Sequence, residues 1–265
     1  MEILGYLASV MIGISLGLIG GGGSILTVPV LVYLFGIDPV PATAYSLFIV
    51  GATSLIGAYP KYRHGQVSIK TAIIFGIPSI IAVYATRRFI IPNIPDTIFS
   101  TETVTLTKPV MLMVLFALLM IFASISMIRD NEEKNDNGNG RQQFNYPMIV
   151  LEGAGVGILT GMVGAGGGFL IIPALVLLSK LPMKLAIGTS LLIIAMKSLI
   201  GFTGDLSHYT MNWKLLLLVT ILAILGIFTG NWLSHKIPGE KLKTAFGWFV
   251  LIMAIYIIMK ELWLK

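Results

Sequence analysis

Long apolar stretches alternate with short polar turns along most of the chain. Six of them are long enough for membrane-spanning helices, which need about 20 apolar residues each. They cover residues 42–58, 68–86, 108–128, 185–203, 213–233 and 244–262. Composition agrees with this pattern, because 56% of the 265 residues are hydrophobic and 11% are charged, against about a quarter charged in soluble domains. The pattern predicts an all-α polytopic membrane protein.

Two glycine-rich runs interrupt further apolar stretches. The first lies in GLIGGGGSILTVP, residues 17–29, and the second in GMVGAGGGFLIIP, residues 161–173. Four glycines in five positions destabilise a helix, and some of the flanking apolar pieces are too short to cross a bilayer comfortably. These pieces are 3–19 with 24–36, and 148–163 with 169–179. We therefore expect broken or re-entrant helices, which membranes tolerate where the backbone is buried in protein or lines a cavity.

The second run belongs to an internal repeat. Ten residues recur 144 positions later in one register: Gly13, Gly17, Gly20, Gly22, Gly23, Pro29, Ala42, Ser46, Gly57 and His64. Glycine matches come easily in a chain with 29 glycines, whereas the matched proline, serine and histidine do not. Between the halves lies a polar segment without apolar periodicity, typical of a flexible linker. The sequence thus predicts a first transmembrane repeat at 1–128, a flexible cytoplasmic linker at 129–145 and a second repeat at 146–265.

The lysines and arginines indicate how the halves are oriented. If each glycine-containing element crosses the membrane once, the halves are parallel and the basic loop residues divide almost evenly between the two faces. If each element enters and leaves on one side, the second half is inverted and the basic residues divide eleven to six. This bias favours inverted-topology repeats in the cytoplasmic membrane, with the richer face in the cytoplasm. Arg87 and Arg88 count with the poorer face.

Paired breaks in two halves are a strong sequence indication of a transporter's binding site. The bare N–H groups of the glycines, and the positive N-terminus of the helix after each run, suit an anion near the bilayer midplane. Helix packing is the alternative, and we assign it to Gly13, Gly17, Gly157 and Gly161 because of their small-xxx-small spacing. The expected substrate-lining glycines are Gly20, Gly21, Gly22, Gly23, Gly164, Gly166, Gly167 and Gly168.

The helix after each run adds polar candidates. In the second half Ser190, Ile194, Lys197 and Gly201 share one helical face. The same positions of the first half hold Ser46, Val50, Thr53 and Gly57. Lys197 is a cation inside a spanning segment and hence a candidate anion ligand, with snorkelling toward the helix end as the alternative. The candidate hydroxyls are those of Ser24, Ser46, Thr189 and Ser190.

Other functions find little support in the sequence. The chain has no cysteine and three histidines without the spacing of metal ligands, so we expect neither a metal nor another cofactor. The net charge of +6 is scattered over short loops, which argues against a nucleic-acid partner. An enzyme would need a nucleophile and a base, whereas His64 and His208 lie near loops, so we expect no catalysis. We expect Glu152 to be an interfacial acid and Asp205 to contact solvent or a loop.

The doubled motif, GGGGSILTVP and GAGGGFLIIP, with AIGTSL at 186–191, resembles the TauE/SafE sulfite-exporter family of membrane transporters. The first half departs from it with ATAYSL at 42–47, which places Tyr45 opposite Thr189. The resemblance implies movement of sulfite, thiosulfate or organosulfonates, and leaves proton coupling open. The residues themselves indicate a secondary anion transporter with alternating access. An anion channel and a non-transporting membrane sensor are the alternatives, and homo-oligomer formation is left open.

Overall fold

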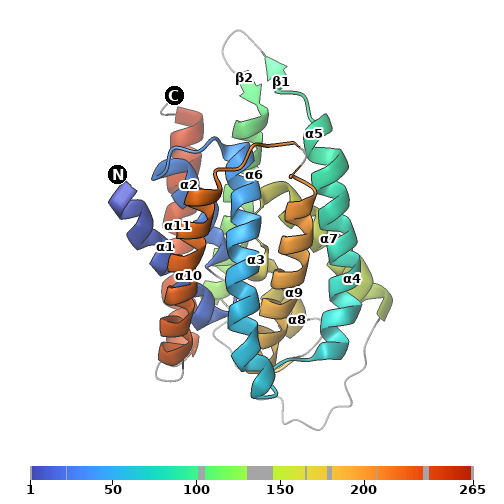
Figure 1. Cartoon of the computed structure of the whole chain (residues 1–265). Helices are drawn as coiled ribbons and strands as arrows, with labels where there is room; N and C mark the ends of the chain where they lie inside the picture. Colours follow the sequence, from blue (N-terminus) through green and yellow to red (C-terminus); the bar gives the residue numbers. More distant parts are fainter. Residues whose placement is uncertain are drawn as a thin grey trace.

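The computed structural model is a bundle of helices (Figure 1). It describes residues 2–21, 23–100, 105–129, 146–164, 166–177, 181–206, 208–234 and 239–263. Gly22 and linker positions 130–145 lie outside the described residues. The helices are α1 (Glu2–Ile19), α2 (Ser24–Tyr33), α3 (Pro39–Arg63), α4 (Ile69–Ala85), the π-helix η1 (Thr86–Ile90), α5 (Ile91–Asn93), α6 (Lys108–Arg129), α7 (Tyr146–Val163), α8 (Gly168–Leu177), α9 (Met183–Thr203), α10 (Trp213–Ser234) and α11 (Gly239–Trp263).

Within the described part of the chain, five helical segments are long and apolar enough to cross a bilayer. They are Pro39–Arg63, Ile69–Asn93, Lys108–Ile125, Lys184–Thr203 and Trp213–Ser234. These segments coincide with five of the six predicted spans, and the sixth falls within α11. Large apolar side chains such as Ile81 and Leu225 are mostly exposed, as expected where a helix faces lipid. The chain is a multi-pass integral membrane protein.

Each glycine run breaks an apolar segment into a long and a short helix, as predicted. The long helices α1 and α7 have 18 residues, and the short helices α2 and α8 have 10. Ten helical residues extend about 15 Å, half the thickness of the hydrocarbon core. The chain leaves each long helix through a glycine with positive φ, +76° at Gly20 and +72° at the equivalent Gly164. Side chains with a Cβ disfavour this conformation, which explains why glycine occurs at both positions.

The two halves exchange packing partners. Helix α1 packs on α10, and α7 packs on α4, which holds the place in the first half that α10 holds in the second. Gly13 of α1 lies against the backbone of Ala223, and Gly157 of α7 against the backbone of Ser79. The two contacts are equivalent in the repeat, because Gly157 lies 144 positions after Gly13 and Ala223 lies 144 positions after Ser79. These glycines serve close helix packing, as predicted.

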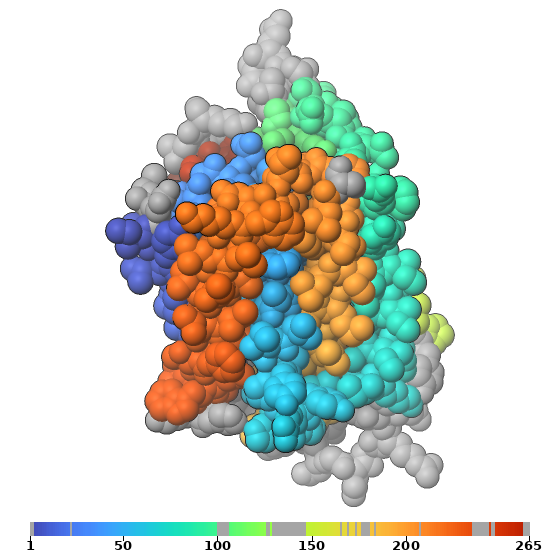
Figure 2. All heavy atoms as spheres, in the orientation of Figure 1, coloured from blue at the N-terminus to red at the C-terminus, as the bar shows by residue number. Residues whose placement is uncertain are grey.

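At the centre, α3 and α9 lie side by side and run in opposite directions (Figure 1). Gly51 of α3 lies beside Leu199, whereas Gly57, further along α3, lies near the earlier Leu191 of α9. These two helices hold equivalent places in the repeat, so this pair of equivalent helices is antiparallel. On the face shown in Figure 2, the side chains of α10, α3, α9 and α4 form a continuous surface.

One small element has no counterpart in the prediction. Strands β1 (Thr97–Ser100) and β2 (Thr105–Thr107) form an antiparallel pair between α5 and α6, at one end of the bundle (Figure 1). Thr97 pairs with Thr107, and Ser100 with Thr105. Threonine and other β-branched residues favour extended backbone. The pair leaves the helical architecture of the bundle unchanged.

Candidate functional site

The two glycine runs touch each other at the centre of the molecule. A Cβ added to Gly21 would lie 2.6 Å from the Cα atom of Gly168, so the two backbones are in direct contact. Helix α2 begins three residues after Gly21, and α8 begins at Gly168 itself. The N-termini of the two short helices therefore converge here, with the partial positive charge that helix N-termini carry.

The helices α3 and α9 enclose this contact. A Cβ on Gly168 would meet the Ile194 side chain at 2.6 Å, and one on Gly166 would meet Val50 at 2.5 Å. Val50 and Ile194 are equivalent positions of the repeat, and both are fully buried. The predicted polar face of α3 and α9 thus points inward, toward the glycine runs.

Two of the four predicted hydroxyls bind the first glycine run. The Ser24 hydroxyl donates to the carbonyl oxygen of Gly21 at 2.7 Å. The Ser190 hydroxyl lies 2.8 Å from the Ile187 carbonyl oxygen of its own helix and 3.1 Å from the carbonyl oxygen of Gly20, across the interface between the halves, so these two acceptors share its one hydrogen. Both serines are fully buried. Their hydroxyls fix the shape of the run, and their oxygens still have capacity to accept hydrogen bonds.

The other two predicted hydroxyls differ from each other. The Thr189 hydroxyl oxygen accepts from the backbone N–H of Ser68 at 2.9 Å, so it ties α9 to the start of α4 and not to the glycine runs. The Ser46 hydroxyl is buried and has no hydrogen-bond partner among the described residues, and the same holds for Thr53 on the same helix. Ser46 and Thr53 therefore have a hydrogen bond to offer a ligand, as do the buried hydroxyls of Thr27, Ser54, Ser79, Thr86 and Ser198 elsewhere in the bundle.

Lys197 extends into the interior and not toward a membrane surface. Its side chain is 0% exposed, and its ammonium group donates to the Thr160 hydroxyl at 2.9 Å. A Cβ on Gly167 would lie 2.7 Å from the Lys197 Nζ atom. No acidic side chain of the described residues forms an ion pair with it. The cation thus lies against the second glycine run, and the snorkelling alternative does not describe this conformation.

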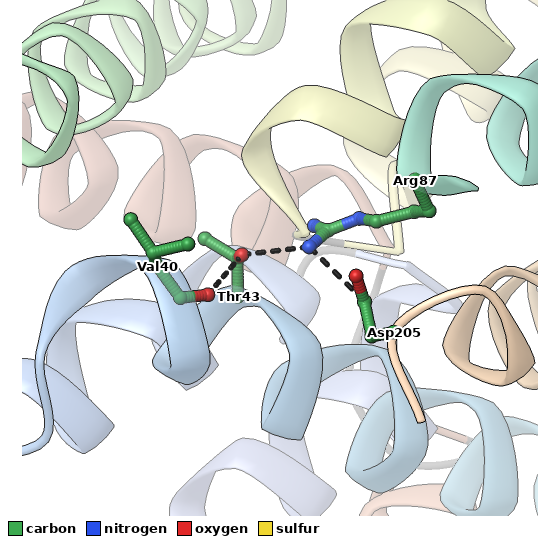
Figure 3. Close-up of polar contacts among 4 residues, drawn as sticks. All are labelled: Val40, Thr43, Arg87 and Asp205. Atoms are coloured by element: carbon green, nitrogen blue, oxygen red, sulfur yellow. Dashed lines mark hydrogen bonds and ion pairs between the residues drawn. The ribbon is translucent and has the colours of Figure 1, made fainter. Parts of the chain in front are cut away.

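The structure adds a buried cation that the sequence prediction placed in a loop. Arg87 lies in η1, at the end of α4, and is 0% exposed. Its Nη1 atom donates to the Thr43 hydroxyl at 2.8 Å and forms an ion pair with the Asp205 carboxylate at 3.2 Å (Figure 3). Figure 3 shows the three side chains coming from different elements. The ion pair therefore joins the end of α4 to the turn after α9, and the hydrogen bond to Thr43 joins both to the start of α3.

One sequence prediction is wrong at this point and another holds in part. Arg87 is not a loop residue, because it lies in η1 and is buried. Asp205 is 1% exposed and so does not contact solvent, whereas its backbone carbonyl accepts from the N–H groups of His208 and Tyr209 in the following turn, as the loop alternative expected. The predicted span ended at residue 86, but the helical backbone continues to Ile90 and carries Arg87 into the interior. Burial raises the pKa of the Asp205 carboxyl, and the Arg87 guanidinium opposes that shift. The sequence did contain one signal of this ion pair: Arg87 and Asp205 carry opposite charges just beyond the ends of the predicted spans 68–86 and 185–203.

Positive charge gathers along the second glycine run. A Cβ on Gly164 would lie 2.6 Å from the Nη2 atom of Arg87, while Lys197 lies at Gly167. By the 144-residue repeat, Arg87 of the first half corresponds to Asn231 in the second, and Lys197 of the second half corresponds to Thr53 in the first. The candidate site is therefore electrostatically asymmetric and suits an anion. Among the described residues, no group of three His, Asp or Glu side chains could hold a metal ion.

Tyr45, which stands opposite Thr189 in the repeat, lies away from the glycine runs. It lines a cavity of about 460 Å³ at the end of the bundle, together with Asp38 and Asn212. Its hydroxyl oxygen accepts a hydrogen bond from the backbone N–H of Asn212. Neither Tyr45 nor Thr189 lies at the contact between the glycine runs. The departure of Tyr45 from the pattern of the second half therefore leaves the glycine site unchanged.

Comparisons with known proteins agree with this architecture. The family model described as sulfite exporter TauE/SafE matches residues 5–257. A probable membrane transporter protein of Xylella fastidiosa (strain 9a5c) is 29% identical over 258 residues, which cover 95% of this chain and 92% of the relative. The probable membrane transporter protein YdhB of Bacillus subtilis (strain 168) is 26% identical over 235 residues, 89% of this chain and 91% of the relative. No solved structure matches significantly. The chain belongs to the sulfite exporter TauE/SafE family of membrane transporters.

Proposed function

We propose that this protein is a secondary transporter of small sulfur-containing anions, such as sulfite, thiosulfate or an organosulfonate. Membership of the family supports a membrane transporter, and the family's description supports the sulfur anion. The observation that carries an anion site is the convergence of two half-length helices, whose N-termini meet at Gly21 and Gly168. Irregular backbone of this kind, buried at membrane depth, is typical of transporter binding sites.

The binding mode that we propose uses three kinds of group. Glycine N–H groups and the N-termini of α2 and α8 face the anion and replace part of its hydration. Ser46 and Thr53 donate their unused hydroxyl hydrogens. Lys197 supplies a full positive charge beside Gly167. Because the first half has Thr53 at the equivalent position, this charge beside the contact between the runs comes from the second half alone.

Alternating access is part of the proposal. The contacts that recur 144 positions apart, and the antiparallel course of α3 and α9, support two inverted repeats. The two runs touch in this conformation, so an anion can bind between them only when they separate. Movement of one half relative to the other supplies that separation and exposes the site to one side at a time.

Transport by purified protein in liposomes tests this function. We expect labelled thiosulfate uptake that saturates with concentration, is competed by unlabelled sulfite and is absent from empty vesicles. An imposed proton gradient, with and without a proton ionophore, tests coupling. Flux of small anions that rises linearly with concentration would instead indicate a channel. The absence of flux from folded protein with any sulfur anion would overturn the proposal.

A further inference from the structure

Arg87 has one edge of its guanidinium group unused. Its Nη1 atom is occupied by Thr43 and Asp205. Its Nε and Nη2 atoms have no hydrogen-bond partner among the described residues, although the side chain is 0% exposed. Nη2 lies beside Gly164, where a Cβ would approach to 2.6 Å. The unused edge is thus buried next to the glycine that ends α7.

This edge has the geometry of an oxyanion ligand. The Nε–H and Nη2–H groups of arginine point in the same direction and donate two parallel hydrogen bonds to two oxygens bonded to one central atom. Buried donors without acceptors are unfavourable, so a ligand that accepts from them gains affinity. Asp205 holds the opposite side of the guanidinium and so fixes the direction in which the edge points.

The unused edge lies beside Gly164, at the start of the second glycine run, whereas the contact between the runs is at Gly168. Thr43, which binds Arg87, lies seven residues from Val50 along α3, about 10 Å at 1.5 Å per residue. Val50 marks the level of the central contact. In the other half the position of Arg87 is held by Asn231, which has no charge. Of these two equivalent positions, only position 87 therefore carries a guanidinium edge.

We propose that Arg87 recognises the oxygen atoms of the transported anion, with its Nε–Nη2 edge binding two oxygens beside Gly164. This inference rests on the proposed transport function, and it adds the group that distinguishes a sulfur oxyanion from a halide. A single ammonium or helix N-terminus attracts both kinds of anion by charge. A planar pair of parallel donors favours the one with two oxygens on the same atom.

Direct binding to the purified protein in detergent tests this role without requiring transport. Calorimetric titrations with sodium thiosulfate and with sodium chloride are compared for the wild type, Arg87→Lys and Arg88→Lys. Arg88 is the exposed neighbour and provides the matched control. We expect Arg87→Lys to raise the Kd for thiosulfate by about tenfold or more, through loss of one charge-assisted hydrogen bond, and to change chloride binding little. Arg88→Lys should bind thiosulfate like the wild type.

A second variant covers the case in which Arg87→Lys does not fold. The double substitution Arg87→Gln with Asp205→Asn removes both charges together, so no unpaired buried charge remains. We expect this variant to be monodisperse and to lose thiosulfate binding. Unchanged thiosulfate affinity in either folded variant would overturn the role of Arg87 and leave the transport proposal intact. Failure of the wild type to bind thiosulfate, sulfite or methanesulfonate would overturn the proposed substrate class as well.

Discussion

Gly157 of α7 packs against Ser79 of α4 so closely that a Cβ on the glycine would lie 2.6 Å from the serine carbonyl oxygen. Two residues earlier on the same helix, Gly155 has nothing within 4 Å of its Cβ position. Glycines on α7 thus have different roles according to the face on which they lie. The pair offers a matched test of the packing between the halves.

Replacement of Gly157 by alanine should destabilise the protein, because the added methyl group forces α7 away from α4. We expect a loss of about 1–3 kcal/mol, as for other overpacked interiors. Gly155→Ala adds a better helix former in open space and should leave stability unchanged or raise it by up to about 1 kcal/mol. Thermal unfolding in detergent compares the two. Equal effects at both positions would contradict the packing role.

The proposed inversion of the two halves predicts opposite labelling of two matched loops. His64 and His208 are equivalent residues, both exposed, in the turns after α3 and α9. The chain has no cysteine, so His64→Cys and His208→Cys each introduce one unique thiol. In intact cells a membrane-impermeant maleimide should label His208→Cys, and it should label His64→Cys only after permeabilisation. Labelling of both from one side would indicate parallel repeats.

Removal of the Asp205 carboxylate should be strongly destabilising. Asp205→Ala leaves the Arg87 cation buried without its ion-pair partner, a change that costs about 3–5 kcal/mol in other proteins. Asp205→Asn retains an oxygen that accepts from Nη1, so its loss should be smaller. Denaturation midpoints of the two variants and the wild type give the comparison. Similar stability of Asp205→Ala and the wild type would show that the ion pair contributes nothing to folding.

Two buried serines should separate binding from stability. The Ser46 hydroxyl has no partner among the described residues, so Ser46→Ala loses no hydrogen bond and should leave stability unchanged or raise it. If this hydroxyl binds the anion, the variant should have a higher KM for thiosulfate uptake. Ser190→Ala loses a hydroxyl that donates to the carbonyl oxygen of Ile187 or of Gly20 and should cost about 1 kcal/mol of stability. An unchanged KM in Ser46→Ala would exclude that serine from the site.

Neutralisation of Lys197 should impair anion binding without unfolding the protein. Methionine has a similar length and removes a buried charge that has no ion-pair partner among the described residues. We expect Lys197→Met to raise the KM for thiosulfate by about tenfold or more, from the loss of a charged donor. Thr160→Val keeps the cation and removes only its hydrogen-bond partner, so its effect should be smaller. Wild-type uptake in Lys197→Met would exclude it as a ligand.

The sequence predicted the helical architecture well because the relevant signals are local. Apolar length determines where a chain crosses the bilayer, and the glycines ended α1 and α7 at Gly20 and Gly164, where the backbone adopts positive φ. The small-xxx-small spacing also identified Gly13 and Gly157 as packing positions, and each lies against the backbone of a neighbouring helix. All of these follow from residue type and spacing within one half of the chain.

The partners of the polar groups could not be predicted in the same way. The acceptor of Lys197, the bond between Thr189 and Ser68, and the ion pair of Arg87 with Asp205 each join segments far apart in the sequence. These contacts depend on how the halves interlock, which hydropathy does not describe. A charge beside the end of an apolar stretch has the same appearance in sequence whether it faces water or the interior.

The exchange of partners between the halves bears on how such a molecule is made and how it arose. Helix α1 is synthesised long before α10, its main neighbour, so the first half enters the membrane with an unsatisfied packing surface until the second half arrives. A single half on its own would need another copy lying antiparallel to it to cover that surface. The proposed inverted repeats would therefore join in one chain two copies that cover each other's packing surface, so that the assembly of two molecules becomes the folding of one.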